Sequence, residues 1–255
     1  GKYFLAKQKR SVGVSEKELI KIAVKSLGLN ELSAFKPEER IIEYQLNDKD
    51  KMKLTEMSLN DFADETASES PAPGGGSISA YLGVLGISLG TMVANLSSHK
   101  KGWDERWEEF SEAAEKGQKI KEELLKMVDE DTNAFNKIMS AFGLPKSNEE
   151  EKEIRTKEIQ SATKYATEIP FKVMQLAYAS MEVIKAMAEK GNPNSASDAG
   201  VGAICAHGAV MGAFLNVKIN AKGLSDKEFA EDIMQKGKHI EEKTEKMKAT
   251  ILETV

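Results

Sequence analysis

The chain has 255 residues, 40% of them hydrophobic, 30% charged and only 6% aromatic, so its core must be built from Leu, Ile, Val, Met and Ala, a mixture that favours helices. A formal net charge of −5 argues against the basic surface that nucleic-acid binding requires. The single cysteine, Cys205, excludes an internal disulfide, and residues 1–20 lack the apolar core of a signal peptide, so we expect a reducing, cytoplasmic location.

Residues 1–46 differ in pattern from the rest of the chain. They contain one clear helix, Glu16 to Leu27, for which Ser15 is the expected N-cap. A short run with strand character follows at Ile41 to Leu46. The charged residues 47–53 form a connector, so we divide the chain into an N-terminal segment of mixed α/β character, residues 1–50, and a second domain, residues 51–255.

The second domain reads as a series of helices. Apolar spacing and capping residues predict helices over residues 59–68, 77–97, 104–142, 148–190 and 199–216 or 199–220, and Ser225 with Glu228 opens the last helix. Pro170 predicts a kink in the fourth of these. No alternating apolar pattern of any length appears after residue 50. The fold class expected is therefore all-α, a multi-helix up-and-down bundle.

Two of these helices carry almost no charge and share a row of small residues. The first row is Ser79, Gly83, Gly86, Gly90 and Ala94, and the second is Gly202, Ala206, Ala209 and Ala213. Small residues let helix backbones approach closely, so we expect this pair at the centre of the bundle, where it could also contact a second subunit. The uncharged run from Ile78 to Leu96 is long enough to cross a membrane, but its glycines and polar residues favour a buried central helix instead.

A polar loop precedes each of the two uncharged helices. The first, "PAPGGGS", lacks the Lys-Ser/Thr ending of a nucleotide-binding P-loop. Its glycines either make a tight helix entry or expose backbone N–H groups to a polar or anionic ligand. The second, "GNPNSASD", contains Asn194, Ser195, Ser197 and Asp198, which either cap the helix or bind a ligand, and capping by Ser197 or Asp198 is the ordinary role.

The segment "KMVDEDTNAF" holds the most informative carboxylate. Asp131 lies three residues after Val128 and four before Phe135, so it falls on the apolar face of its helix, whereas Asp129 points away. Burial raises the pKa of a carboxyl group towards the range useful for proton transfer, so Asp131 is either a general acid–base or a structural aspartate. Lys100 and Lys101 follow the first uncharged helix as ordinary surface charges or as a site for a carboxylate.

Four ordered motifs, "SPAPGGGSISA", "VDEDTNAF", "GNPNSASDAGVGA" and "NVKIN", resemble the cyclodeaminase domain of formimidoyltransferase-cyclodeaminase and the related methenyltetrahydrofolate cyclohydrolases. The resemblance covers residues 55–255. Residues 1–46 resemble the C-terminal piece of a formimidoyltransferase domain, most of which is absent, so no transferase activity is expected, nor any contribution of this segment to the chemistry.

The resemblance implies a reaction in which 5-formimidoyltetrahydrofolate closes to 5,10-methenyltetrahydrofolate and releases ammonia, with no tightly bound cofactor or metal. It assigns catalysis to Asp131, with Asp129 as the alternative. It also places a folate site on Gly74, Gly75, Gly76, Ser77, Asn194, Ser195, Asp198, Asn216 and Asn220. Lys100 and Lys101 are then candidates for holding a polyglutamate tail, and a homodimer is expected. A cyclohydrolase, a non-catalytic folate-binding domain and a dimerisation domain are the alternatives.

Overall fold

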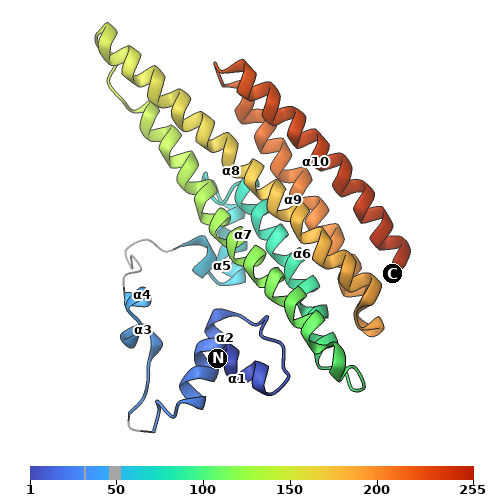
Figure 1. Cartoon of the computed structure of the whole chain (residues 1–255). Coiled ribbons are helices and arrows are strands. Elements are labelled where there is room, and N and C mark those ends of the chain that lie inside the picture. Colours follow the sequence, from blue (N-terminus) through green and yellow to red (C-terminus); the bar gives the residue numbers. More distant parts are fainter. Residues whose placement is uncertain (32, 46–52) are drawn as a thin grey trace.

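The computed structural model describes residues 1–31, 33–45 and 53–255, and every regular element in this part is a helix (Figure 1). Five long helices form a bundle in which each runs antiparallel to the next along the chain. They are α6 (Gly75–Ser98), α7 (Trp107–Phe142), α8 (Glu149–Lys190), α9 (Ala196–Lys222) and α10 (Lys227–Thr254). The predicted all-α up-and-down bundle is therefore confirmed.

Short helices precede and connect the long ones. These are α1 (Lys2–Lys7), α2 (Glu16–Ser26), α3 (Pro37–Arg40), α4 (Ile42–Gln45), η1 (Leu54–Glu56), α5 (Leu59–Ala67), η2 (Asp104–Arg106) and η3 (Pro193–Ser195). The strand expected from Ile41 is wrong over residues 42–45, which form the helical turn α4. A strand needs a neighbouring strand to satisfy its backbone, and the described residues contain none. Leu46 and residues 47–52 of the connector lie outside the described residues.

Side-chain caps account for where several helices begin. Ser15 accepts the Glu18 N–H at the start of α2, and Asn148 accepts the Glu151 N–H at the start of α8. The cap predicted for α10 is wrong, because Asp226 and not Ser225 accepts the N–H of Phe229.

The expected cap of α9 is wrong as well. Ser197 and Asp198 both lie inside the first turn of that helix, and its N-cap position is occupied by Ser195 without a side-chain hydrogen bond. The 3₁₀ turn η3 brings the chain into α9 one turn earlier than the sequence pattern suggests. Asp198 is consequently a first-turn residue, where a negative charge is favourable.

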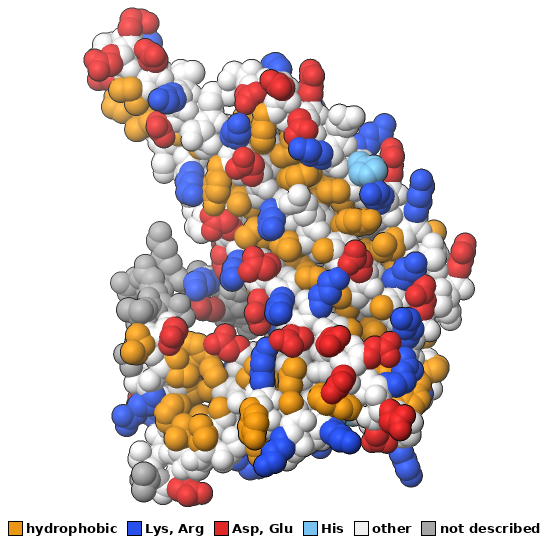
Figure 2. Space-filling model, viewed as in Figure 1, with side chains coloured by type: hydrophobic (Ala, Val, Ile, Leu, Met, Phe, Trp, Pro, Cys, Tyr) orange, Lys and Arg blue, Asp and Glu red, His pale blue; other side chains and the backbone are white. Residues whose placement is uncertain are grey.

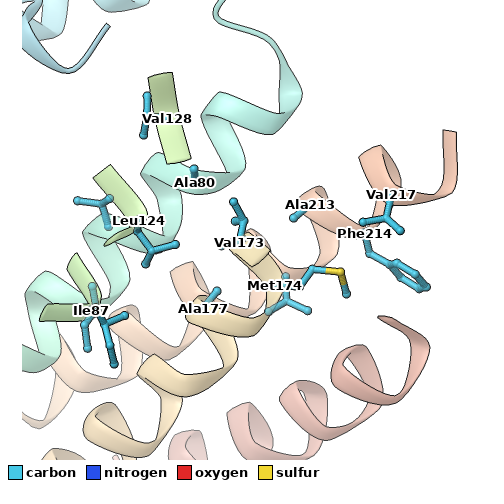
Figure 3. Packing of buried hydrophobic residues seen from close by; sticks show 14 of the residues in the cluster. Ala80, Ile87, Leu124, Val128, Val173, Met174, Ala177, Ala213, Phe214 and Val217 are labelled. Atoms are coloured by element: carbon cyan, nitrogen blue, oxygen red, sulfur yellow. The ribbon is translucent and has the colours of Figure 1, made fainter. Parts of the chain in front are cut away.

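The largest hydrophobic cluster joins α6, α7, α8, α9 and α10. Figure 3 shows Ala80 and Ile87 of α6 beside Leu124 and Val128 of α7, with Val173, Met174 and Ala177 of α8 between them and the α9 residues Ala213, Phe214 and Val217. All ten of these side chains are buried. Nine of these ten side chains are Ala, Val, Leu, Ile or Met, as the composition predicts.

Helices α6 and α9 pack against each other with their backbones in close approach. A Cβ added to Gly86 would lie 2.8 Å from the Gly202 carbonyl oxygen, and one added to Gly202 would lie 2.9 Å from the Gly86 carbonyl oxygen. At one end of the pair Gly75 faces Asn216, and at the other the Asn192 N–H donates to Ser97 Oγ over 2.8 Å. The two helices are therefore antiparallel neighbours at the centre of the bundle.

One face of this central pair remains exposed and apolar. Nine large side chains on it expose between 37% and 67% of their surface: Ile78, Leu85, Met92, Leu96, Val201, Ile204, Met211, Leu215 and Ile219. Both helices are also long and apolar enough to cross a membrane by length and composition, with 61% and 50% of the most apolar stretch buried inside the protein. On the face seen in Figure 2, acidic and basic side chains are interspersed with hydrophobic ones.

Candidate active site

Asp131 lies where the middle of α7 meets the first turn of α6. The Ser77 N–H donates to Asp131 Oδ2 over 2.9 Å, and the Ser77 hydroxyl lies 3.1 Å from the same oxygen. The N-cap of α6 is Gly74, which has no side chain to accept an N–H group. Asp131 therefore supplies from α7 the acceptor that a capping side chain normally provides.

The other carboxylate oxygen, Asp131 Oδ1, lies against Gly76 and has no hydrogen-bond partner among the described residues. A Cβ at Gly76 would overlap the carboxylate, so only glycine allows this approach. Burial raises the pKa of the Asp131 carboxyl above its ordinary value, and the hydrogen bonds from Ser77 oppose part of that rise. One oxygen is thus anchored while the other is free to exchange a proton.

Asp131 faces a cavity of about 210 Å³ between α6, α7, α8 and α9. The loop before α6 forms one wall through Pro71, Ala72, Gly74, Gly75 and Gly76, and α9 contributes Asn216 and Asn220. An apolar wall is made by Ala134, Phe135, Ile138 and Ala166, and Thr132 also lines the cavity. Ligand sites usually measure about 300–1,000 Å³, so this cavity suits one end of a ligand rather than a whole drug-sized molecule.

The two asparagines of α9 are fixed by hydrogen bonds from their amide groups. Asn216 Nδ2 donates to the Gly212 carbonyl over 2.9 Å, and Asn220 Nδ2 donates to the Ala166 carbonyl over 2.7 Å. Their Oδ1 atoms are then available as acceptors at the cavity. Among the described residues no group of three His, Cys, Asp or Glu side chains could hold a metal ion.

The structure brings together only part of the predicted site. Gly74, Gly75, Gly76, Ser77, Asp131, Asn216 and Asn220 meet at one end of the bundle. Asn194, Ser195 and Asp198 lie at the opposite end of α9, about 27 Å or more from Asn216 by helix rise. Lys100 and Lys101 follow the far end of α6, where Lys100 Nζ sits 4.0 Å above the Trp103 ring.

Asp129 lies outside the cavity and has a different role. Its Oδ1 accepts the Leu54 N–H and its Oδ2 accepts the Thr55 hydroxyl, both over 2.8 Å. Asp129 thereby ties the turn η1, which follows the connector, to α7. Although Asp129 and Asp131 are two residues apart on α7, Asp129 binds η1 and Asp131 binds the start of α6.

Sequence reasoning missed the aromatic wall and Thr132. Phe135 lies on the apolar face predicted for this helix, yet it is 37% exposed and lines the cavity, and Phe142, seven residues further along, is 51% exposed. The apolar stripe of α7 leaves the core beyond Val128 because α7 and α8 extend past the other helices there (Figure 1). Spacing from Asp131 was the available signal, since Phe135 and Ile138 follow it by four and seven residues.

Comparison with known proteins gives consistent matches. The profile of the family described as Formiminotransferase-cyclodeaminase matches residues 58–239, and that of the Formiminotransferase domain matches residues 1–47. A methenyltetrahydrofolate cyclohydrolase from Methylorubrum extorquens is 37% identical over 198 residues, which are 78% of this chain and 95% of that protein. A formimidoyltransferase-cyclodeaminase from Gallus gallus is 35% identical over 252 residues, 98% of this chain. The chain spans only 46% of the length of that relative.

A solved structure resembles the bundle. The formiminotetrahydrofolate cyclodeaminase from Thermotoga maritima aligns with a TM-score of 0.71 and 29% identity, covering 79% of this chain and 97% of that one. The alignment therefore includes almost all of the neighbouring protein.

Proposed function

Because the chain belongs to the formiminotransferase-cyclodeaminase family, we propose that it is a folate-converting enzyme that closes 5-formimidoyltetrahydrofolate to 5,10-methenyltetrahydrofolate and releases ammonia. The observation that carries the proposal is the arrangement of Asp131, which lines the cavity with one oxygen anchored by Ser77 and the other without a hydrogen-bond partner among the described residues. A desolvated carboxylate of this kind can both accept and return a proton.

The chemistry requires proton movements on neighbouring atoms. N10 of the folate attacks the formimidoyl carbon, forming the C–N10 bond, and N10 loses its proton. The formimidoyl nitrogen (=NH) gains two protons, one that came from N10 and one from solvent, and leaves as ammonia when its bond to that carbon breaks, which leaves the methenyl product with one positive charge. Asp131 Oδ1 accepts the proton from N10 and returns it to the departing nitrogen, so one carboxylate serves both steps.

The cavity wall favours the flat end of a folate. Bare backbone at Gly74 and Gly75 lets a planar ring approach the start of α6, and Asn216 and Asn220 offer acceptors at its edge. Phe135 and Ile138 supply an apolar surface opposite. The remainder of the substrate extends beyond the cavity.

A second function is supported by one of the relatives. Since a methenyltetrahydrofolate cyclohydrolase matches most of this chain, the same carboxylate could deprotonate water for attack on the methenyl carbon. Assaying the purified chain with 5-formimidoyltetrahydrofolate and with methenyltetrahydrofolate separates the two. We expect methenyltetrahydrofolate to form from the first substrate, as its near-ultraviolet absorbance can show. Consumption of the second substrate alone would favour the cyclohydrolase. If the protein catalysed neither reaction, a role in folate binding or in dimerisation would be the remaining alternative.

We further propose that the protein is a homodimer through the exposed face of α6 and α9. The nine apolar side chains there expose on the order of 800 Å², which is what each partner of a standard interface buries. We propose a second copy as the occupant, because the face is uncharged over the whole length of α6 and because two-fold symmetric dimers pair the same patch on both subunits.

A two-fold axis perpendicular to these helices would also complete the site. Such an axis places the start of the partner's α9 beside the cavity. The part of the folate that extends beyond the cavity can then contact the partner's Asn194, the partner's Ser195 and the partner's Asp198. The partner's Lys100 and the partner's Lys101 arrive at the same end and suit the carboxylates of a polyglutamate tail. The residues that lie apart within one chain then form one site.

A further inference from the structure

The hydroxyl of Thr132 is buried next to the proposed catalytic group without a hydrogen-bond partner. Three described residues have such a buried side-chain atom: Thr132, Asn95 and Gln118. The amide groups of Asn95 and Gln118 at least donate to the Gly13 carbonyl, at 3.0 and 3.3 Å. Thr132 has no side-chain hydrogen bond within the described part of the chain, although buried hydroxyls normally find one.

Helical threonines elsewhere in this protein satisfy their hydroxyls locally. Thr91, Thr167 and Thr244 each donate to the carbonyl four residues earlier, over 2.7–2.8 Å. For Thr132 the equivalent acceptor is the Val128 carbonyl. That carbonyl instead accepts the Ser77 hydroxyl over 2.9 Å, in addition to the helical N–H of Thr132 itself.

A carbonyl oxygen has two lone pairs, so these two donors occupy the Val128 carbonyl fully. The same Ser77 that anchors Asp131 therefore also takes the acceptor that the Thr132 hydroxyl would otherwise use. Thr132 lines the cavity with Asp131, and no other group in the described residues accepts or donates a hydrogen bond at its hydroxyl. The unpaired hydroxyl is thus a consequence of how the site is built.

We propose that Thr132 is a further substrate-binding residue, whose hydroxyl hydrogen-bonds to the one-carbon group of the bound folate. This inference rests on the proposed function. The one-carbon group carries a nitrogen or oxygen atom with a lone pair, and it must lie beside Asp131 to exchange its proton. A side chain that is left unpaired in the free protein gains a partner only on binding, which is how function commonly trades against stability.

Three variants test the inference. Thr132→Val keeps the shape and removes the hydroxyl, Thr132→Ser keeps the hydroxyl, and Thr167→Val removes a buried helical hydroxyl that has a partner outside the cavity. Ring-closure kinetics, tetrahydrofolate affinity by titration and Tm are measured for each, beside the wild type.

We expect Thr132→Val to lower kcat/KM about 10- to 100-fold, the range for one lost hydrogen bond, with a Tm equal to or above that of the wild type. Thr132→Ser should stay within about threefold of the wild type, and Thr167→Val should lower Tm without changing kcat/KM. A merely structural role would instead lower the Tm of Thr132→Val.

Normal kinetics and affinity in Thr132→Val, with a wild type that turns over, would overturn the role of Thr132 and leave the proposed function standing. If the wild type binds folate without turning it over, the catalytic proposal fails. The inference about Thr132 is then decided by affinity alone: weaker binding by Thr132→Val supports it, and equal binding overturns it. A wild type that neither binds folate nor turns it over would overturn both the proposed function and the role of Thr132.

Discussion

The backbone N–H of Ser77 donates to Asp131 Oδ2 over 2.9 Å, joining the first turn of α6 to the middle of α7. The contact satisfies one N–H group at a helix start that lacks a capping side chain, and it orients a carboxylate whose burial raises its pKa. Helix capping and the proposed acid–base chemistry therefore depend on the same two residues.

Replacing Ser77 by alanine should move the acidic limb of the pH–rate profile to higher pH. The hydroxyl proton is shared between the Val128 carbonyl at 2.9 Å and Asp131 Oδ2 at 3.1 Å, and its share at Oδ2 stabilises the ionised form of Asp131, so its removal raises the pKa of the carboxyl further. Profiles of kcat/KM against pH measure the shift. Ser79→Ala is the control, because its hydroxyl donates to the Gly75 carbonyl within the same helix. A limb that stays in place would show that Ser77 does not tune Asp131.

Asp131→Asn should fold at least as stably as the wild type at neutral pH. Burial disfavours the charged form, so the folded protein binds the Asp131 proton more tightly than the unfolded chain does. The stability that this tighter proton binding gives the wild type is fully present below the pKa of Asp131 in the unfolded chain. It is lost as the pH rises through the raised pKa of Asp131 in the folded protein. The stability difference between variant and wild type should therefore shrink on acidification, as urea titrations at several pH values can measure. A variant that loses stability only as pH rises would contradict the sign of this shift.

Gly76→Ala should reduce turnover strongly while Asp131 remains present. The added methyl group overlaps the carboxylate and must displace it from the cavity. A misplacement of about 1 Å can lower a rate about 100-fold. Gly200→Ala is the matched control, since its Cβ would meet only Val255 and Leu252 at 3.4–3.6 Å. Normal turnover in Gly76→Ala would show that the approach of Gly76 to Asp131 is not required.

Ile204→Glu should dissociate the proposed dimer, because it places a charge in the apolar face of α9. Ile154→Glu on α8 is the control; Ile154 is 53% exposed and Ile204 52%. Sedimentation velocity should give a monomer for the first variant and a dimer for the second. Two dimeric variants would place the interface elsewhere.

Mixing inactive subunits tests whether the site is shared. In a mixed dimer, an Asp131→Asn subunit still carries Asp198 and an Asp198→Asn subunit still carries Asp131. The two subunits can form one intact site only if each site takes Asp131 from one subunit and Asp198 from the other. Co-refolded at equal amounts, they should recover about a quarter of wild-type activity, since half the dimers are mixed and each has one intact site. No recovery would mean that Asp198 does not act across the interface.

The long helices could be predicted from sequence because their periodicity and their caps agree. The strand at residues 41–46 could not, since β-propensity depends on a neighbouring strand. Adjacent cap formers such as Ser225 and Asp226 cannot be ranked without the backbone direction that enters the helix.

Only part of the candidate site could be predicted, because a local sequence pattern reports some of its residues and not others. Asp131 could be found because its helix face is periodic. The proposed role of Thr132 depends on Ser77, 55 residues earlier, which occupies the Val128 carbonyl, and no local sequence pattern indicates that contact. The separation of Asp198 from Asp131 within one chain follows from antiparallel packing of α6 and α9, which motif order alone does not reveal.

The most direct measurement compares ring closure by Asp131→Asn and Asp129→Asn. Asparagine keeps the shape of each side chain and removes its titratable group, so Asp131→Asn should slow formation of methenyltetrahydrofolate by about 10²–10⁴-fold. Asp129→Asn should remain near the wild-type rate, because Asp129 holds Leu54 and Thr55 outside the cavity and its amide can still accept one of those bonds. A normal rate for Asp131→Asn with loss in Asp129→Asn would contradict the account and move the catalytic role to Asp129.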